Sequence, residues 1–205
     1  MTLLVTQRKD TIGEMSCNPS IGGVGKGTLI REIDAMGGLI GRVADMSGIQ
    51  FKVLNSSKGA AVQGPRAQMD RDNYKKNMQK MLFEDVDKRL ELYQGSVHDL
   101  IVEGGECVGI VMEDGVELRA KSVVITTGTF LGGMVHIGKE KREAGRYMRH
   151  TDKEDDKDGG EQKVEPASNA LSQSLKNLNF PVGRLRTGTP PRLNSETINF
   201  EGLEV

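Results

Sequence analysis

Cysteine is scarce in this 205-residue sequence, occurring only at Cys17 and Cys107. No CxxC pair and no Cys/His cluster has the spacing of a zinc site, so the sequence argues against a structural metal and for a reducing compartment. Long apolar runs are also missing, since none approaches the roughly 20 residues that a membrane span needs. The first residues, MTLLVTQRKD, lack the layout of a secretory signal. These absences predict a soluble protein without a metal site.

A strong excess of charge of one sign is lacking too, because the formal net charge is only −1. Nothing in that balance demands nucleic acid as a partner. The charges are unevenly placed, however: the segment from Lys52 to Lys80 is mainly basic, whereas the segment from Thr151 to Glu165 is acid-rich. The neutral total therefore hides local fields that a polyanion could sense. The stretch 150–165 has no apolar anchors and predicts a disordered, solvated loop, with an acidic interaction tag as the alternative.

The first part of the chain carries a strand signal, a glycine-rich loop and a helix signal. Thr2–Thr6 is a β-branched and leucine run typical of a buried parallel strand. Because a single residue precedes this run, we expect the N-terminus to be truncated. From Thr28 onward, apolar residues recur at helical spacing as far as Val43, which predicts an amphipathic helix broken at Gly37 and Gly38.

The middle of the chain predicts a loop, a helix and a small sheet. Residues 49–70 are rich in small and basic residues, which predicts a loop-rich segment that lines a binding site. Asp70 is expected to cap a helix that runs to about Phe83. Three strand signals follow, joined by a Gly-Gly and an Asp-Gly turn pair, and they predict a three-stranded meander. These signals cover residues 97–102, 108–112 and 116–118.

A further apolar run, SVVITT at 122–127, predicts a second buried strand that is closed by Gly128. This order of elements is typical of an α/β, Rossmann-like FAD-binding domain of the two-dinucleotide-binding flavoprotein type, in which a β-meander forms the crossover. Both chain ends look cut, so we expect the domain to be incomplete at both ends. The expected divisions are a partial FAD-binding domain at 1–149, the charged insert at 150–165, and a continuation toward a second, NAD-related domain at 166–205.

The glycine-rich stretch that begins at Met15, MSCNPSIGGVGKGTLIREID, allows three interpretations. A P-loop needs GxxxxGK followed by Ser or Thr, but Ser20 stands at the first glycine position and Gly27 follows Lys26. The dinucleotide pattern GxGxxG fails because Thr28 occupies its third glycine position. A plain turn and an anion- or cofactor-facing loop therefore remain. In the latter, glycines let backbone amides approach a ligand, and the following helix N-terminus favours negative charge.

Five separated motifs occur in the order of one known family. They are MSCNPSIGGVGKGTLIREIDAMGG, GIQFKVLNSSKGAAVQGPRAQMDR, VVITTGTFLGG, HIG and GRLRTGTPPR. With them, the sequence resembles the MnmG (GidA) family of FAD-dependent tRNA modification enzymes over nearly all residues except the 150–165 insert. The resemblance implies that the loop after Met15 lies on the flavin side.

The resemblance implies a reaction on tRNA. Family members install a carboxymethylaminomethyl or related group on carbon 5 of the wobble uridine, using FAD, NADH and a methylene-tetrahydrofolate carbon, together with the GTPase partner MnmE. FAD would supply the redox step and the protein would position it. The resemblance also implies a homodimer for the full-length protein. The charged insert favours the mitochondrial matrix as its location, with the bacterial cytoplasm as the alternative.

The resemblance carries a catalytic role to Cys17, the cysteine of the SCNP motif. Neighbouring glycine amides and Lys26 would stabilise a thiolate there, and a thiolate adds readily to a uracil ring. A structural loop cysteine is the alternative interpretation. Cys107, which falls on a predicted strand, is interpreted as a packing residue.

The cofactor-binding residues that the resemblance implies are Val97, Ser168, Gly22, Gly23 and Gly128. Val97 would face the adenine side through its backbone, and Gly128 would let the chain pass close to the dinucleotide. As alternatives, Val97 is an ordinary strand residue, and Ser168 is only the N-cap of a helix. Five arginines are candidates for tRNA or flavin phosphates, namely Arg66, Arg71, Arg184, Arg186 and Arg192.

The sequence also departs from the family pattern. The leading strand and the GxGxxG turn that cradles the FAD pyrophosphate are absent from these 205 residues, so we expect them to bind FAD weakly on their own. The proline of the family motif SKGPAV is Ala60 here. Two rival functions stay open: a non-catalytic fragment or pseudoenzyme with a tRNA- or partner-binding surface, and a generic FAD oxidoreductase.

Overall fold

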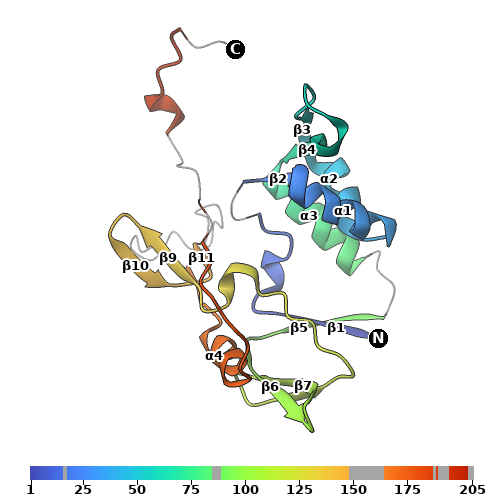
Figure 1. The fold of residues 1–205 in the computed structure, drawn as a ribbon, viewed down its shortest axis with the longest axis vertical. Helices are drawn as coiled ribbons and strands as arrows, with labels where there is room; N and C mark the ends of the chain where they lie inside the picture. Colours follow the sequence, from blue (N-terminus) through green and yellow to red (C-terminus); the bar gives the residue numbers. More distant parts are fainter. Residues whose placement is uncertain (16–17, 85–88, 148–163, 187, 189–193, 203–205) are drawn as a thin grey trace. The chain divides into compact units, whose positions relative to one another are not determined.

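The chain folds into two compact units in this computed structural model, which describes residues 1–15, 18–84, 89–147, 164–186, 188 and 194–202 (Figure 1). Unit 1 is formed by Met1–Ser16 and Tyr74–Gly183, and unit 2 by Cys17–Asn73 and Arg184–Val205. Most of the predicted 150–165 loop lies outside the described residues, and its last two residues form a short strand. In the described part of the chain, no helix is long and apolar enough to cross a membrane.

Unit 1 combines a parallel strand pair with antiparallel strands and two helices, the first of which begins in unit 2 (Figure 1). Its strands are β1 (Thr2–Thr6), β5 (Leu90–Gln94), β6 (Val97–Glu103), β7 (Glu106–Met112), β8 (Glu117–Arg119), β9 (Met134–Ile137), β10 (Glu140–Glu143), β11 (Arg146–Tyr147) and β12 (Val164–Glu165). Its helices are α3 (Arg71–Phe83) and α4 (Asn169–Asn177), with 3-10 turns η1 (Lys9–Thr11) and η3 (Gly128–Phe130).

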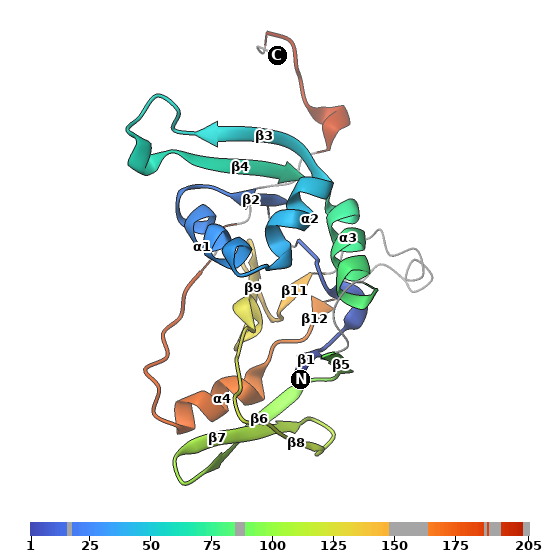
Figure 2. The same ribbon diagram turned by 90° about the vertical axis from the view of Figure 1, so that its right-hand side faces the viewer.

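Unit 2 is a three-stranded antiparallel sheet in the order β2-β4-β3 with two helices packed on β2 and β4 (Figure 2). Its strands are β2 (Ser20–Gly22), β3 (Gly48–Leu54) and β4 (Gly64–Met69). Its helices are α1 (Val24–Ala35) and α2 (Leu39–Ser47), with 3-10 turns η2 (Ala60–Val62) and η4 (Ser195–Thr197).

The predicted strand at Thr2–Thr6 is confirmed, and so is its parallel pairing. β1 pairs with β5 in register from Thr2 opposite Leu90 to Thr6 opposite Gln94. It is less buried than predicted, because Leu3 keeps 41% of its surface exposed. The sequence prediction missed β5, since LELYQ alternates apolar and polar residues over only five positions.

The predicted meander is confirmed as β6-β7-β8, with turns at Gly104-Gly105 and at Gly115. Gly104 and Gly115 have φ values of 59° and 85°, a region that glycine adopts without steric cost. The predicted buried strand at 122–127 is wrong: these residues form no strand, and Val124 is 83% exposed. No described strand pairs with the segment, and a strand without a hydrogen-bonded neighbour is not stable on its own.

The helix predictions were confirmed in type and shifted at one boundary. Asp70 caps α3, because its Oδ1 accepts hydrogen bonds from the backbone N–H of Asp72 and Asn73 at 3.0 and 2.9 Å. The predicted break at Gly37 and Gly38 separates α1 from α2. α1 begins at Val24, before the predicted Thr28, so part of the glycine-rich stretch is the first helical turn.

The prediction that residues 49–70 are loop-rich is wrong for most of the segment. β3 and β4 form an antiparallel ladder in which Phe51 lies opposite Ala67 and Lys52 opposite Arg66. β4 is the central strand, and its inward side chains, including Met69 at 2% exposure, supply part of the core. β3 lies at the exposed edge of the sheet, but its sequence carries a strand signal that the loop prediction overlooked, because Ile49, Phe51 and Val53 alternate with Gln50 and Lys52.

Candidate functional site

The predicted site residues are divided between the two units. Unit 1 contains Val97, Gly128 and Ser168, and unit 2 contains Gly22 and Gly23. Cys17 lies outside the described residues.

Ser168 and the loop that starts at Gly128 lie together in unit 1. The backbone N–H of Ser168 donates to the Phe130 carbonyl at 2.8 Å, and the N–H of Gly132 donates to the Ser168 carbonyl at 3.3 Å. Leu131 and Ser168 also form a parallel β-bridge. Gly128 has a φ of 57°, and a side chain there would meet no atom within 4 Å. Its backbone is thus open for the close approach of a ligand.

Close packing fixes the shape of this 128–133 loop. The Phe130 ring lies so near the backbone of Gly145 that a Cβ at Gly145 would overlap it. The Arg146 guanidinium sits 5.5 Å from the centre of the same ring. Arg146 is ion-paired with Glu165, whose side chain is 3% exposed. The buried Arg146–Glu165 pair on β11 and β12 therefore packs against Phe130 of the loop and helps to fix its conformation.

Gln7 extends this group from the carboxyl end of β1. Its Nε2 donates to Ser168 Oγ at 3.5 Å. Its Oε1 is buried and has no hydrogen-bond partner among the described residues. An unsatisfied buried acceptor costs free energy, so this atom calls for a donor from a ligand or water. Sequence reasoning missed Gln7, although its place just after a parallel strand is where dinucleotide-binding folds hold ribose hydroxyls.

Ser168 occupies the N-cap position of α4, as one interpretation predicted, but its side chain makes no capping hydrogen bond. Its hydroxyl instead accepts the hydrogen bond from Gln7. Gln7 Oε1 and the Ser168 hydroxyl thus form one polar group, and the Ser168–Phe130 hydrogen bond joins it to the loop that begins with the open backbone of Gly128. The chemistry of this donor set fits a ligand with hydroxyl groups beside a close backbone passage, as in the ribose and ribityl parts of a flavin dinucleotide.

Val97 is joined to this group only indirectly. It is the first residue of β6, lies opposite Met112 and is half-buried. Two residues on, the Asp99 carboxylate accepts a hydrogen bond from the Ser174 hydroxyl of α4. This bond, with a smaller contribution from the Leu100 N–H, holds the pKa of Asp99 below its usual value. The Asp99–Ser174 bond ties β6 to the helix that begins next to Ser168.

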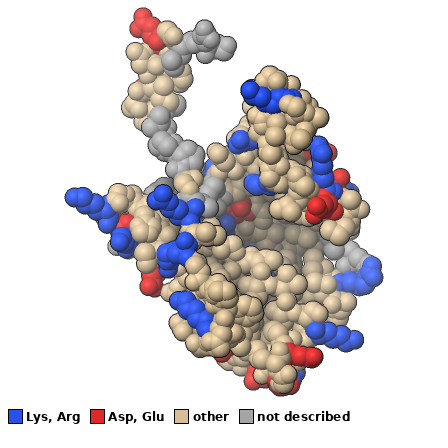
Figure 3. Space-filling view, in the orientation of Figure 1, with Lys and Arg blue, Asp and Glu red and all other residues tan. Residues whose placement is uncertain are grey.

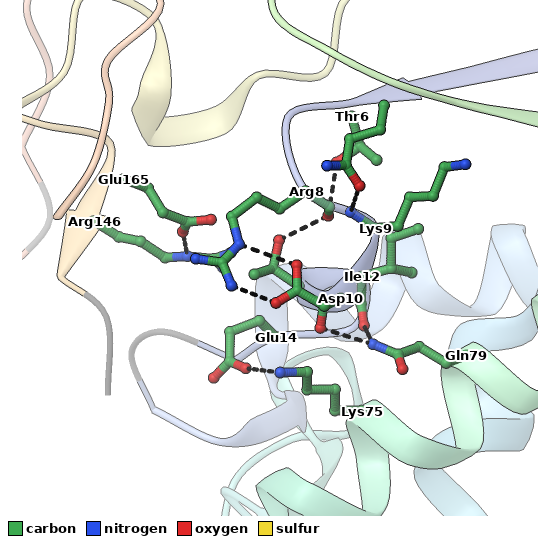
Figure 4. A network of polar contacts seen from close by, with 12 residues as sticks. Thr6, Arg8, Lys9, Asp10, Ile12, Glu14, Lys75, Gln79, Arg146 and Glu165 are labelled. Carbon is green, nitrogen blue, oxygen red and sulfur yellow. Dashed lines mark hydrogen bonds and ion pairs between the residues drawn. The ribbon is translucent and has the colours of Figure 1, made fainter. Parts of the chain in front are cut away.

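A polar network holds the segment that follows Gln7 (Figure 4). Arg8 pairs with Asp10, and its hydrogen bond holds the pKa of the Asp10 carboxyl below its usual value. Lys75 Nζ lies 3.3 Å from Glu14 Oε2. Gln79 Nε2 donates to the carbonyls of Asp10 and Ile12 at 2.9 and 3.1 Å. Contacts with α3 thereby order the chain between β1 and the SCNP motif.

The glycine turn of unit 2 is built by packing against β4. Gly22 has a φ of 103°, and a Cβ there would collide with the Pro65 carbonyl. Gly23 has a φ of 96°, and its N–H donates to the same carbonyl at 2.9 Å. A Cβ at Gly23 would have only Leu54 nearby, at 3.9 Å. Glycine is thus needed at position 22 for the close packing of β2 against β4. At Gly23 the space beside the backbone is free for a ligand to approach.

Cys107 gives no second site in the described part of the chain. Cys107 lies half-buried on β7, and its thiol donates to the Gly109 carbonyl at 3.6 Å, a placement that suits a packing role. Among the residues that the structure describes, no group of three or more His, Cys, Asp or Glu side chains could hold a metal ion.

Comparison with known proteins gives one family over the whole sequence. The family model of glucose inhibited division protein A matches residues 1–205. Two crystal structures of GidA from Aquifex aeolicus, in form II and form I, are 43% identical to the chain, each with a TM-score of 0.81. Each match covers 98% of this chain, which spans 30% and 31% of the two Aquifex chains. This likeness confirms the predicted α/β, Rossmann-like fold class.

Proposed function

The chain belongs to the glucose inhibited division protein A family, and on that premise we propose that it is part of an FAD-dependent enzyme that modifies tRNA. The observation that supports this proposal is the polar group of Gln7, Ser168 and Gly128, which has the donors, acceptor and open backbone that a flavin dinucleotide needs. A generic FAD oxidoreductase is disfavoured by the SKGAAVQGPRAQ and GRLRTGTPPR motifs of the family. A pseudoenzyme would bind tRNA without modifying it, so a modification assay separates it from the enzyme.

FAD, when bound, would supply the redox chemistry of the reaction. The residues of this chain would bind and orient it. Gln7 Oε1 would accept a hydrogen bond from a ribose or ribityl hydroxyl, Ser168 would hold the Gln7 amide in position, and Gly128 would let the dinucleotide pass close to the backbone. NADH and methylene-tetrahydrofolate are proposed as co-substrates on the resemblance alone.

The reaction proposed is the addition of a carboxymethylaminomethyl-type group to carbon 5 of the wobble uridine. Cys17 is the proposed nucleophile, whose thiolate would add to the uracil ring and thereby activate carbon 5. A MnmE-type GTPase partner, a homodimer and a mitochondrial matrix location complete the proposal, with the bacterial cytoplasm as the alternative location.

Replacement of Gln7 tests the cofactor role of this group. In the gene product that contains this sequence, Gln7→Leu should weaken FAD binding about tenfold, because one buried hydrogen bond to the cofactor is lost. The cofactor-free form should keep or gain stability, since the unsatisfied Oε1 is removed. Flavin fluorescence titration and thermal melting measure the two effects. Gln173→Leu, at an exposed glutamine of α4, is the matched control. Unchanged FAD affinity in Gln7→Leu would remove Gln7 from the site.

A further inference from the structure

The sheet of unit 2 carries positive charge without any negative charge. Neither β2 nor the whole hairpin from Gly48 to Met69 contains an aspartate or glutamate. The same segments contain Lys52, Lys58 and Arg66. In Figure 3, Lys and Arg side chains are visible at the tip of the β3–β4 hairpin, where no Asp or Glu side chain shows. This sheet is therefore a local source of positive potential in a chain of nearly neutral total charge.

The strand register places two of the cations on the same face. Lys52 lies opposite Arg66, and Arg66 lies opposite Gly22 across the next pair of strands. Residues directly opposite each other in a sheet point their side chains to the same side. The neighbouring row, Phe51 opposite Ala67 opposite Ile21, points to the other side. Ala67 and Ile21 are buried in that row. The cationic row thus lies on the face opposite the core.

The hydrogen bonds of these cations leave their charge uncompensated. Arg66 Nη2 donates to Ser20 Oγ at 3.0 Å, and Lys26 Nζ donates to the Ser20 carbonyl at 3.4 Å. Both acceptors are neutral. No ion pair between either cation and a carboxylate of the described residues is present. Ser20 therefore brings two positive charges together beside Lys52, an arrangement that favours binding of an anion.

The spread of the cations indicates an extended anion. Lys52 lies in the middle of a seven-residue edge strand, Lys58 lies in the hairpin loop, and Lys26 lies in the first turns of α1. A single phosphate or pyrophosphate is held by donors that converge on one point. A polynucleotide backbone presents phosphates in a row and is bound by separated Lys and Arg side chains.

We propose that this cationic face binds the sugar–phosphate backbone of the RNA substrate. It is formed by Lys52 and Arg66 of the sheet, by Lys26, which shares Ser20 with Arg66, and by Lys58 of the hairpin loop. The proposal rests on the proposed function for the choice of RNA. It assigns to the β2-β4-β3 sheet the task of positioning RNA, separately from the cofactor group of unit 1. The contacts are to phosphates, so they carry affinity and register without reading the base sequence.

Charge-removing variants of two cations test the proposal. Lys52→Gln and Arg66→Gln are compared with wild type for binding of an unmodified tRNA transcript at salt concentrations from about 50 to about 200 mM. Each lost phosphate contact should make the slope of log affinity against log salt shallower by about 0.9. Over this fourfold range of salt, the variant should therefore lose about 3.5-fold less affinity than the wild type loses. Arg66→Lys keeps the charge and should restore most of the slope. It shows whether the effect of Arg66→Gln comes from the lost charge or from the lost hydrogen bond to Ser20.

The control is Arg119→Gln on β8, because the charge of Arg119 is already compensated by Glu103 at 2.6 Å. It should bind tRNA as wild type does. FAD affinity, measured beside tRNA affinity, separates the two sources of phosphate. Weaker FAD binding with unchanged tRNA binding in Lys52→Gln and Arg66→Gln would assign the face to the dinucleotide and overturn the proposal. Salt slopes equal to wild type would overturn it as well.

The proposed function and this surface fail in different ways. If tRNA binds with the predicted salt dependence but is never modified, the enzyme activity is refuted and the RNA-binding face stands. If tRNA is modified while both variants bind it as tightly as wild type at every salt concentration, the face is refuted and the activity stands.

Discussion

Replacement of Glu165 by glutamine should destabilise unit 1 strongly. Glu165 is ion-paired with Arg146, and their side chains are 3% and 16% exposed. Removing one partner of a buried pair leaves the other charge without compensation, at a cost of about 3 to 5 kcal/mol. We expect the lower end, about 3 kcal/mol, because Arg146 retains some contact with water and lies against the Phe130 ring. A loss of that size lowers the melting temperature by about 6 to 12 °C.

Thermal melting followed by circular dichroism measures this loss. Glu103→Gln is the matched control, since it breaks the Arg119–Glu103 pair, whose side chains are 58% and 55% exposed, and should shift the midpoint little. The double variant Arg146→Met/Glu165→Leu should recover much of the stability, because no isolated buried charge remains. A Glu165→Gln midpoint within the range of the Glu103→Gln control would refute the reasoning that the pair supports the 128–133 loop.

Three further predictions concern the loop, the tie between β6 and α4, and the nucleophile. Gly145→Ala should destabilise by about 1 to 3 kcal/mol, because the added methyl overlaps the Phe130 ring; equal melting of Gly145→Ala and Gly183→Ala, where the Cβ meets open space, would contradict this. Ser174→Ala removes the hydroxyl that lowers the pKa of Asp99. The wild type has this stabilisation above the unfolded pKa of about 3.9 and loses it as the pH falls through the lower folded pKa, so the difference in melting temperature should shrink below about pH 4. A difference that stays constant from pH 7 to pH 3 would count against it. Cys17→Ser should abolish uridine modification while its FAD and tRNA affinities stay near those of the wild type. Cys107→Ser should stay active. Full activity in Cys17→Ser would show that Cys17 is not the nucleophile.

The elements that the sequence predicted correctly are those fixed by contacts between residues close together along the chain. Asp70 caps α3 through hydrogen bonds from the backbone of residues two and three positions later. Gly37 and Gly38 end α1 because of their own backbone preferences, whatever the tertiary contacts of the helix. The meander was predictable for the same reason, because its strands are joined by tight turns. Signals of this kind need no knowledge of distant contacts.

Features that depend on distant pairing were missed or misassigned. β4 exists as a strand because it pairs with β2 and β3, a pairing that its local sequence GPRAQM does not encode, whereas the alternation in β3 was overlooked. The run at 122–127 has strong strand propensity, yet no described strand lies beside it. In the site, Ser168 was placed at the right helix end, but its side chain interacts with Gln7, which is 161 residues away in sequence. Only the folded chain reveals that Gln7 has a buried oxygen with no hydrogen-bond partner among the described residues.

FAD-dependent modification of tRNA is tested by mass spectrometry of nucleosides from tRNA treated with the gene product that contains this sequence. Cofactor-free protein is incubated with unmodified tRNA, NADH, methylene-tetrahydrofolate and a GTPase partner, once with FAD and once without it. We expect a heavier wobble uridine, substituted at carbon 5, only in the reaction that contains FAD. An unchanged uridine in both reactions, or equal modification with and without FAD, would contradict it.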